Sequence, residues 1–307
     1  MARLLAAFLI GFLLLAQHAG AQSVPGPAST ATPSAAGAAA PAGVSHMTSE
    51  QLKAAEEAII KESQNPVGTI AIIPFQNNWN YGSGLYDRTQ YNLNIQPVVP
   101  IEITPKLTLV ERTIIPLLDQ PSPFGPVQCA STGCPRTFGV GDTQEQLFFA
   151  PKVKAGEIVW GAGPIFYLPT ATPGTLGSGK TSVGPTVVAL VITGPFVMGM
   201  LANQAWSVIG RASAPNVSVF FAQPFINYNF GRGWALSTAP GITANWNAPG
   251  NNKWTVPTGM GITKTFKLGD QLQQLSLAHY VNVVRPLGAP AGTYRISWNL
   301  LFPVKRH

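Results

Sequence analysis

The sequence predicts an all-β protein, an antiparallel transmembrane β-barrel of about twelve strands that follows a disordered linker and one short helix. Three observations support this fold class. Long segments alternate between apolar residues and small or polar residues, which is the period of a β-strand with two different faces. Only 10% of the 307 residues are charged, against about 25% in ordinary soluble domains. The N-terminus also has the features of an export signal.

Residues 1–21 have the pattern of a signal peptide. Arg3 precedes an apolar run at 4–16, and small residues at 19–21 form a cleavage site. A retained membrane anchor is disfavoured because this run is shorter than the roughly 20 residues that a spanning helix needs. Export, together with long alternating strands, predicts the outer membrane of a diderm bacterium. We expect outer-membrane lipid and the barrel-assembly machinery as partners.

A linker and a short helix are predicted before the barrel. Residues 22–47 are mainly Ala, Pro, Ser, Thr and Gly, a composition that cannot form a core and predicts disorder. A helix is predicted at 48–64, because a capping box lies at 48–51 and Asn-Pro follows at 65–66. We expect it to lie across the periplasmic mouth of the barrel and partly close it. The alternatives are a plug inside the lumen and a docking site for a periplasmic protein. Its apolar stripe consists of Leu52, Ala55 and Ile59.

The barrel is assigned to residues 66–304, and the segment 234–246 shows its pattern best. The even residues from Trp234 to Trp246 are mostly apolar, whereas the odd residues are small or polar. A tryptophan at each end of the apolar face matches the aromatic residues that mark the two interfaces of a transmembrane barrel strand. Lipid would contact the even face and the lumen the odd face. Lys264 is an exception on the apolar face of the next strand.

The same alternation predicts twelve strands, and an even number is typical of single-chain bacterial barrels. The connections alternate between short turns, assigned to the periplasm, and longer loops, assigned to the cell exterior. The longest loop is predicted at 117–143. The strands are predicted near 67–80, 89–103, 106–116, 144–151, 157–168, 183–192, 196–208, 217–230, 233–246, 253–267, 273–284 and 293–303.

Prolines inside the predicted strands conflict with a regular ladder, because each one removes a backbone donor. We expect bulges that bend the wall and narrow the lumen. The functional alternative is a loose seam that releases an apolar solute sideways into lipid. The prolines concerned are Pro97, Pro100, Pro164, Pro185, Pro224, Pro240 and Pro257.

The inward faces of these strands carry mostly uncharged polar side chains. Such a lining favours a weakly selective passage over the charged ring of an ion filter. The candidate lumen residues are Asn92, Asn94, Gln96, Glu102, Arg112, Asn203, Asn227, Asn229, Asn245, Arg295 and Asn299.

Binding of nucleic acid or nucleotide is not expected. The net charge is +7, but the lysines and arginines are scattered singly rather than gathered in a basic run. Residues 174–181 match the phosphate-loop pattern. That pattern requires a helix to follow, whereas a strand rich in Pro and β-branched residues follows here. After Thr181 the only carboxylate is Asp270, so a magnesium ligand is also missing from the sequence pattern.

The sequence likewise predicts no catalysis and no cofactor. A hydrolase built on a barrel would need a histidine as base, and only His279 lies in a predicted strand, on its apolar face. Cys129 and Cys134 lie in one loop of an exported chain, where a disulfide is favoured. A zinc site is the weaker alternative, because little more than Asp119 or Asp142 could complete it.

Four stretches, at 161–170, 223–230, 275–286 and 295–305, resemble a bacterial family of outer-membrane transporters. The family is named after the meta-cleavage pathway of phenol degradation, and some of its members carry a neuromedin label. The resemblance covers essentially the whole predicted barrel, and its motifs are those of walls and turns. It implies an outer-membrane barrel and a passage for aromatic or other hydrophobic compounds, without catalytic or binding residues. The chain departs from the commoner barrel ending, because five residues follow Phe302.

Together, these observations predict a passive outer-membrane channel for small hydrophobic or aromatic compounds. The alternative is a structural barrel that binds a protein partner through its loops or its N-terminal helix, without transport. A lumen filled by side chains would favour that alternative, whereas a continuous path would favour transport.

Overall fold

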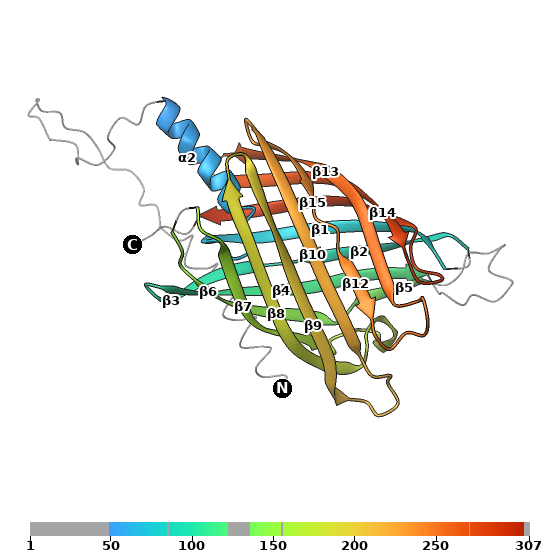
Figure 1. Cartoon of the computed structure of the whole chain (residues 1–307). Helices are drawn as coiled ribbons and strands as arrows, with labels where there is room; N and C mark the ends of the chain where they lie inside the picture. The colour runs from blue at the N-terminus through green and yellow to red at the C-terminus, as the bar shows by residue number, and fades with distance from the viewer. Residues whose placement is uncertain (1–48, 85, 122–135, 155, 270, 304–307) are drawn as a thin grey trace, which may run out of the picture. The chain divides into compact units, whose positions relative to one another are not determined.

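The computed structural model describes residues 49–303 apart from 85, 122–135, 155 and 270. Within these residues the chain forms one α-helix, α2 (Ser49–Glu62), one short 3₁₀ helix, η1 (Gly174–Leu176), and fifteen β-strands in a single sheet (Figure 1). The predicted signal peptide and linker lie outside the described residues. Cys129 and Cys134 lie outside them too.

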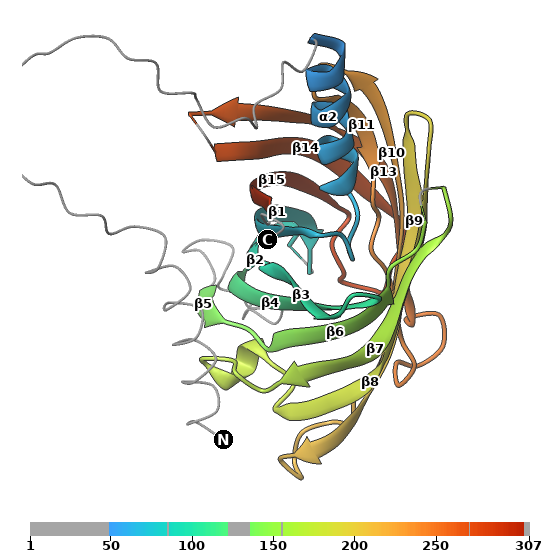
Figure 2. The ribbon, with the colours of Figure 1, turned by 90° about the vertical axis from the view of Figure 1, so that its left-hand side faces the viewer.

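The sheet closes on itself as an antiparallel barrel of twelve wall strands, which confirms the predicted fold class. Figure 2 shows the strands curving around one interior. Three wall strands are each divided in two, namely β2 with β3, β5 with β6, and β11 with β12, because both parts pair with the same neighbour. The strand bounds are β1 Ile70–Ser83, β2 Arg88–Ile95, β3 Val98–Thr104, β4 Leu107–Pro121, β5 Arg136–Val140, β6 Thr143–Pro151, β7 Val159–Leu168, β8 Lys180–Thr193, β9 Phe196–Gly210, β10 Ser218–Gly231, β11 Trp234–Thr238, β12 Ile242–Asn245, β13 Trp254–Leu268, β14 Gln271–Val284 and β15 Gly292–Pro303.

The two ends of the barrel differ in their connections. At the end where β1 begins, the β8–β9 and β10–β11 connections are tight, with positive φ at Gly194 (52°) and Gly231 (93°), as tight hairpin turns require. We call this the turn end and the opposite end the loop end. The predicted loop at 117–143 is wrong in part, because β4 continues to Pro121 and pairs with β5. The wall strand therefore extends further at the loop end than its hydrophobic pattern indicates.

Outward and inward faces alternate along the strands as predicted. On β11, Trp234 and Leu236 are exposed at 39% and 44%, whereas Ala235 between them is 1% exposed. Ala244 on β12 is buried although its position is outward. Its neighbours Phe220 and Trp254 cover it, with their ring centroids 6.2 Å apart. The outer surface of β10 to β13 is therefore apolar and bears aromatic clusters, as a surface in contact with hydrocarbon requires.

Lys264, the exception on the outward face of β13, lies beside the turn end. It pairs with Trp234 across β13 and β11. Its ammonium lies 5.0 Å from the centroid of the Trp234 ring and donates to the carbonyl of Arg232 in the turn. A long side chain can thus carry its charge to the polar boundary while its stem stays on the apolar face.

Some of the prolines coincide with irregularities in the wall, as predicted, whereas Pro100 and Pro224 lie in ladders without a register shift at these residues. The ladder is interrupted at Pro97 between β2 and β3 and at Pro240 between β11 and β12. The β13–β14 register shifts at Pro257. Pro164 on β7 lies opposite Pro185 on β8, and neither residue has a donor for the other strand. A seam that opens into lipid stays a prediction.

The helix α2 buries a different face from the predicted one. Ala55 and Ile59 of the predicted stripe are exposed, Ile59 at 36%, whereas Ile60 is 4% exposed. The burial of Leu52, the third residue of the stripe, lies outside what the structure describes. The predicted stripe assumed that the helix docks along its length, but α2 projects from the turn end and buries mainly its last turn (Figure 1). Among the described residues, no helix is both long and apolar enough to cross a membrane.

The assignment of faces predicts the effect of a charge on the outer wall. Leu277 lies in the middle of β14 and is 56% exposed. Leu277→Arg should destabilise the barrel in lipid by about 2–4 kcal/mol, because it places a charge in hydrocarbon. Thr255→Arg, at an inward position of β13 that lines the lumen, should cost much less. Urea unfolding in lipid vesicles, followed by heat-dependent gel mobility, measures both. Equal destabilisation by Leu277→Arg and Thr255→Arg would contradict the assignment of outward and inward faces.

Candidate functional site

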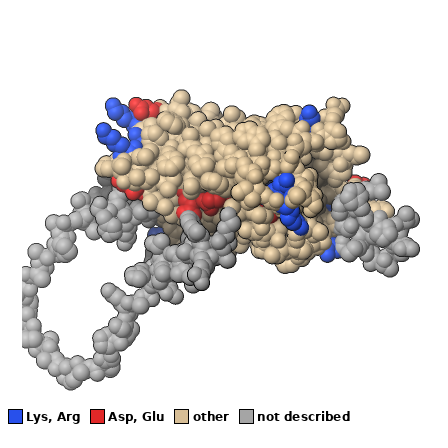
Figure 3. All heavy atoms as spheres, turned by 90° about the horizontal axis from the view of Figure 1, so that it is seen from below, with Lys and Arg blue, Asp and Glu red and all other residues tan. Residues whose placement is uncertain are grey.

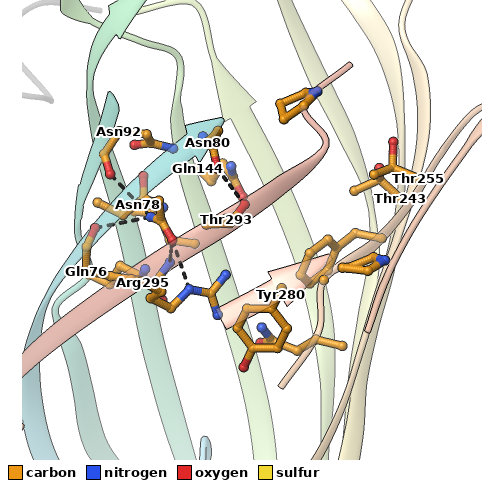
Figure 4. A pocket seen from close by; sticks show the side chains of 18 of the residues that line it. Gln76, Asn78, Asn80, Asn92, Gln144, Thr243, Thr255, Tyr280, Thr293 and Arg295 are labelled. Carbon is orange, nitrogen blue, oxygen red and sulfur yellow. Dashed lines mark hydrogen bonds between the residues drawn. The ribbon is translucent and has the colours of Figure 1, made fainter. Parts of the chain in front are cut away.

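A cavity of about 540 Å³ occupies the lumen towards the loop end, and we call it the chamber. Its lining residues take inward positions on β1, β2, β4, β6 and β7 and, across the lumen, on β10 and β12 to β15 (Figure 4). This volume lies within the range of small-molecule sites in proteins. The chamber is therefore large enough to hold one small solute.

Side-chain amides dominate the chamber wall. They can donate and accept hydrogen bonds, so they suit either water or a polar solute. Some are already bonded within the wall. The Thr293 hydroxyl donates to Asn80 Oδ1 at 2.7 Å, and Asn78 Nδ2 donates to the Asn92 carbonyl at 3.2 Å (Figure 4). The lining amides are Gln76, Asn78, Asn80, Asn92, Asn94, Gln96, Gln144, Gln146, Gln223 and Asn282.

Two arginines also line the chamber, and neutral groups hold both. Arg112 on β4 donates from Nη2 to Gln96 Oε1 at 2.9 Å. Arg295 on β15 donates from Nε to Asn78 Oδ1 at 2.9 Å, and its guanidinium lies 4.9 Å from the centroid of the Tyr280 ring (Figure 4). Stacking on an aromatic face favours the cation. Both arginines are therefore oriented by the wall itself.

The interruption between β11 and β12 is repaired from inside the lumen. The backbone N–H of Ala239 donates to the Tyr280 hydroxyl at 3.1 Å. The Ala239 carbonyl accepts from Gln223 Nε2 at 3.2 Å and from Arg295 Nη1 at 3.5 Å. An unpaired backbone group is costly in a wall that faces lipid. Side chains in the lumen thus provide the hydrogen bonds that the Ala239 backbone cannot form with a neighbouring strand next to Pro240.

Towards the turn end the inner face of β4, β6 and β8 to β10 is apolar, and its buried side chains pack together with Val67 as the inner apolar cluster. Their exposed fractions are 7% or less, which means that this part of the interior is packed like a core. Phe221 lines the chamber and also packs against the cluster, so the two regions adjoin. The members are Val67, Val110, Phe148, Ala150, Val188, Leu190, Val197, Leu201 and Phe225.

The segment between α2 and β1 enters the barrel at the turn end. Its Val67 belongs to the inner apolar cluster, and the Val67 N–H donates to Asn65 Oδ1 at 3.0 Å. Gln64 and Asn229 on β10 exchange two side-chain hydrogen bonds, of 2.8 and 3.1 Å. This segment therefore enters the mouth of the lumen, and the last turn of α2 lies beside the β8–β9 and β10–β11 turns. Partial closure of the mouth by the helix stays a prediction.

The predicted lumen residues fall into separate places. Glu102 lies at the turn end, where it lines a cavity of about 340 Å³ and forms an ion pair with Lys152 at 2.9 Å. Asn229 is bound to Gln64 at the same end, and Asn245 is exposed where β12 ends. Asn203, Asn227 and Asn299 take inward positions outside the chamber lining. The residues that line the chamber are Asn92, Asn94, Gln96, Arg112 and Arg295. A role in solute passage stays a prediction for all of them.

Several inward residues were missed from the sequence. Gln144 and Gln146 on β6 alternate with outward residues, so the same parity rule could have found them. Phe148 on that strand and Leu190 on β8 also face inward. They are apolar, however, and look in the sequence like residues that face lipid. A strand with apolar residues on both faces carries no parity signal.

The segment that matches a phosphate loop has structural partners instead. The helix η1 is a single short turn, and β8 begins at Lys180, so no helix follows the motif. The Ser178 hydroxyl donates to the Asp142 carboxylate at 2.8 Å, and Lys180 Nζ donates to Asn216 Oδ1 at 2.9 Å. The absence of nucleotide binding stays a prediction.

His279 lies on the outward face of β14, as predicted. Its Nε2 is 2.9 Å from the Tyr81 hydroxyl, and its ring stacks on Tyr294 with centroids 4.5 Å apart. The described residues contain no group of three or more His, Cys, Asp and Glu side chains that could hold a metal ion. Figure 3 shows charged side chains sparsely distributed over one face of the molecule.

Comparison with solved structures identifies the type of fold. The chain is similar to an outer membrane channel from Pseudomonas putida F1, with a TM-score of 0.56 and 16% identity over 76% of this chain and 94% of that chain. The NanC porin has a TM-score of 0.48 and 10% identity over 76% and 100% of the two chains. Outer membrane phospholipase A from Escherichia coli has a TM-score of 0.37 and 13% identity over 76% of this chain and 92% of that chain. No protein-family model and no curated protein matches the sequence.

The first of these structures shows that the chain has the fold of an outer-membrane barrel channel. The other two are too distant to add to that conclusion. The resemblance to the meta-cleavage pathway transporters is therefore supported at the level of the fold alone.

The partners of the phosphate-like segment predict a neutral substitution. Lys180→Ala removes one exposed hydrogen bond to Asn216, so it should change the free energy of unfolding by no more than about 0.5 kcal/mol. Neither the unchanged protein nor the variant should bind ATP. Urea unfolding and titration with a fluorescent ATP analogue measure the two quantities. Saturable binding that Lys180→Ala abolishes would show that the motif is functional.

Proposed function

We propose that the protein is a passive channel of the bacterial outer membrane that passes small solutes with an apolar or aromatic body. The chamber inside the lumen is the observation that carries this proposal, because a purely structural barrel needs no cavity of about 540 Å³. The fold shared with an outer-membrane channel agrees with it. Outer-membrane lipid surrounds the wall, and the barrel-assembly machinery inserts it.

The two linings support a solute of mixed character. Amides of the chamber replace part of the water around the polar group of a solute. The inner apolar cluster beyond Phe221 offers contacts to an apolar body and disfavours small hydrated ions. Flux then follows the concentration gradient, with no chemical step. The proposal assigns no catalytic role to His279, which faces away from the chamber and packs on Tyr294.

A second candidate function rests on the inner apolar cluster itself. These side chains pack part of the lumen as a core, and a filled lumen is what a structural barrel would have. In that case the loops or α2 would bind a protein partner. Among the helix residues whose burial is described, 50, 54–56, 58 and 59 are exposed, as a docking element requires. Measurement of flux decides between the two functions.

The experiment compares solute entry with and without the segment that occupies the mouth. Liposomes that contain the protein should swell in phenyl glucoside faster than liposomes without protein. Deletion of residues 49–68 should raise this rate severalfold, because it removes Val67 from the inner apolar cluster and the Gln64 contact with Asn229. The swelling rate, measured by light scattering, is the readout.

A deletion of residues 22–48 is the matched control, because it leaves α2 and the following segment in place and should not change the rate. Heat-dependent gel mobility shows whether each barrel is folded. Folded barrels that admit no phenyl glucoside, with or without residues 49–68, would exclude the channel and favour the structural barrel.

A further inference from the structure

The chamber carries positive charge without a matching negative charge. Arg112 and Arg295 are its charged lining residues, and no aspartate or glutamate is among the described residues that line it. The nearest acidic residues along these strands, Glu111 on β4 and Glu145 on β6, have the opposite parity and face outward. Glu145 accepts a hydrogen bond there from the Thr113 hydroxyl at 2.7 Å. A cleft lined by one sign of charge concentrates ions of the other sign.

Both guanidinium groups keep donors for a ligand. A guanidinium has five N–H donors. Arg112 uses a donor on Gln96, and Arg295 uses donors on Asn78 and on the Ala239 carbonyl. On both arginines further N–H groups have no acceptor among the described residues. Because the bonded donors fix each plane, the remaining ones are pre-oriented for a planar acceptor such as a carboxylate.

Apolar and aromatic surface lies in the same chamber. Ile114, Val219 and Phe221 line it together with the rings of Tyr167 and Tyr280. Phe221 connects this surface with the inner apolar cluster. A small inorganic anion would gain nothing from these contacts, whereas an apolar body would lose unfavourable contact with water.

We infer that the chamber selects organic anions, namely solutes that carry a carboxylate on a compact apolar or aromatic body. The carboxylate accepts hydrogen bonds from one of the two arginines, the charge of the other arginine attracts the anion into the chamber, and the body lies against the apolar and aromatic side chains of the lining. An organic cation of the same size is repelled by both arginines. This inference narrows the solute class of the proposed channel and rests on that function for passage, although binding in the chamber is measurable without passage.

Calorimetric titration of the full protein in detergent tests the binding step. Sodium benzoate should bind, sodium acetate should bind at least about tenfold more weakly, and phenyltrimethylammonium chloride should not bind. Arg112→Gln and Arg295→Gln should each raise the Kd for benzoate, about tenfold or more for the arginine that bonds the carboxylate and less for the other, which contributes only its positive charge. Arg232→Gln is the matched control, since Arg232 is exposed in the β10–β11 turn, and it should leave the Kd unchanged.

The lysine variants separate charge from folding. Heat-dependent gel mobility shows whether each variant is folded. If the glutamine variants do not fold, Arg112→Lys and Arg295→Lys replace them in the test, because lysine keeps the positive charge. They should still bind benzoate in preference to the aromatic cation, but more weakly than the arginines, because lysine lacks the planar fork. Equal binding of benzoate and the aromatic cation by the unchanged protein would overturn the inference. So would an unchanged benzoate Kd in folded glutamine variants.

Passage is measured separately in planar bilayers under a gradient of sodium benzoate. The reversal potential should have the sign of a membrane more permeable to benzoate than to sodium, and the glutamine variants should reduce it. Benzoate binding that depends on both arginines, without any conductance or flux, would uphold the anion site and exclude the channel. Conductance with equal permeability to benzoate and sodium, and no benzoate binding, would uphold the channel and overturn the anion site.

Discussion

The constraint behind this structure is that the wall must pair its own backbone groups, because hydrocarbon supplies no hydrogen-bond partner. Closure of β15 on β1 meets that demand for the ladder as a whole. Where Pro240 interrupts the ladder, Ala239 finds its partners in Tyr280, Gln223 and Arg295. The lumen therefore does more than provide a path. It supplies the side chains that allow an irregular strand to remain in a closed wall.

The inner surface is free of the lipid constraint, and the chain uses this freedom in two ways. Towards the loop end, amides and arginines surround a chamber. Towards the turn end, side chains such as Phe148 and Leu201 pack as tightly as a soluble core. Val67 joins that packing from the segment before β1, so the chain closes part of its own mouth with a residue outside the wall. A polar chamber is thereby placed next to an apolar, packed region.

The sequence predicted the wall better than the interior. Alternation such as that of Trp234, Ala235 and Leu236 reports the lipid face directly, because lipid imposes one chemical character on every outward position. Phe148 faces inward and is apolar, so no single strand reveals its side. The mouth depends on partners distant in sequence: Gln64 meets Asn229 across 165 residues. For the same reason, Ile60 rather than Ile59 is buried, because only the last turn of α2 meets the wall.

The repair at Ala239 gives one side chain two duties. Arg295 completes the hydrogen bonding of an interrupted strand and also provides half of the positive charge in the chamber. A neutral residue at position 295 would leave Gln223 as the remaining side-chain donor to the Ala239 carbonyl. A substitution at this position therefore acts on the charge of the chamber and on the interrupted strand at the same time.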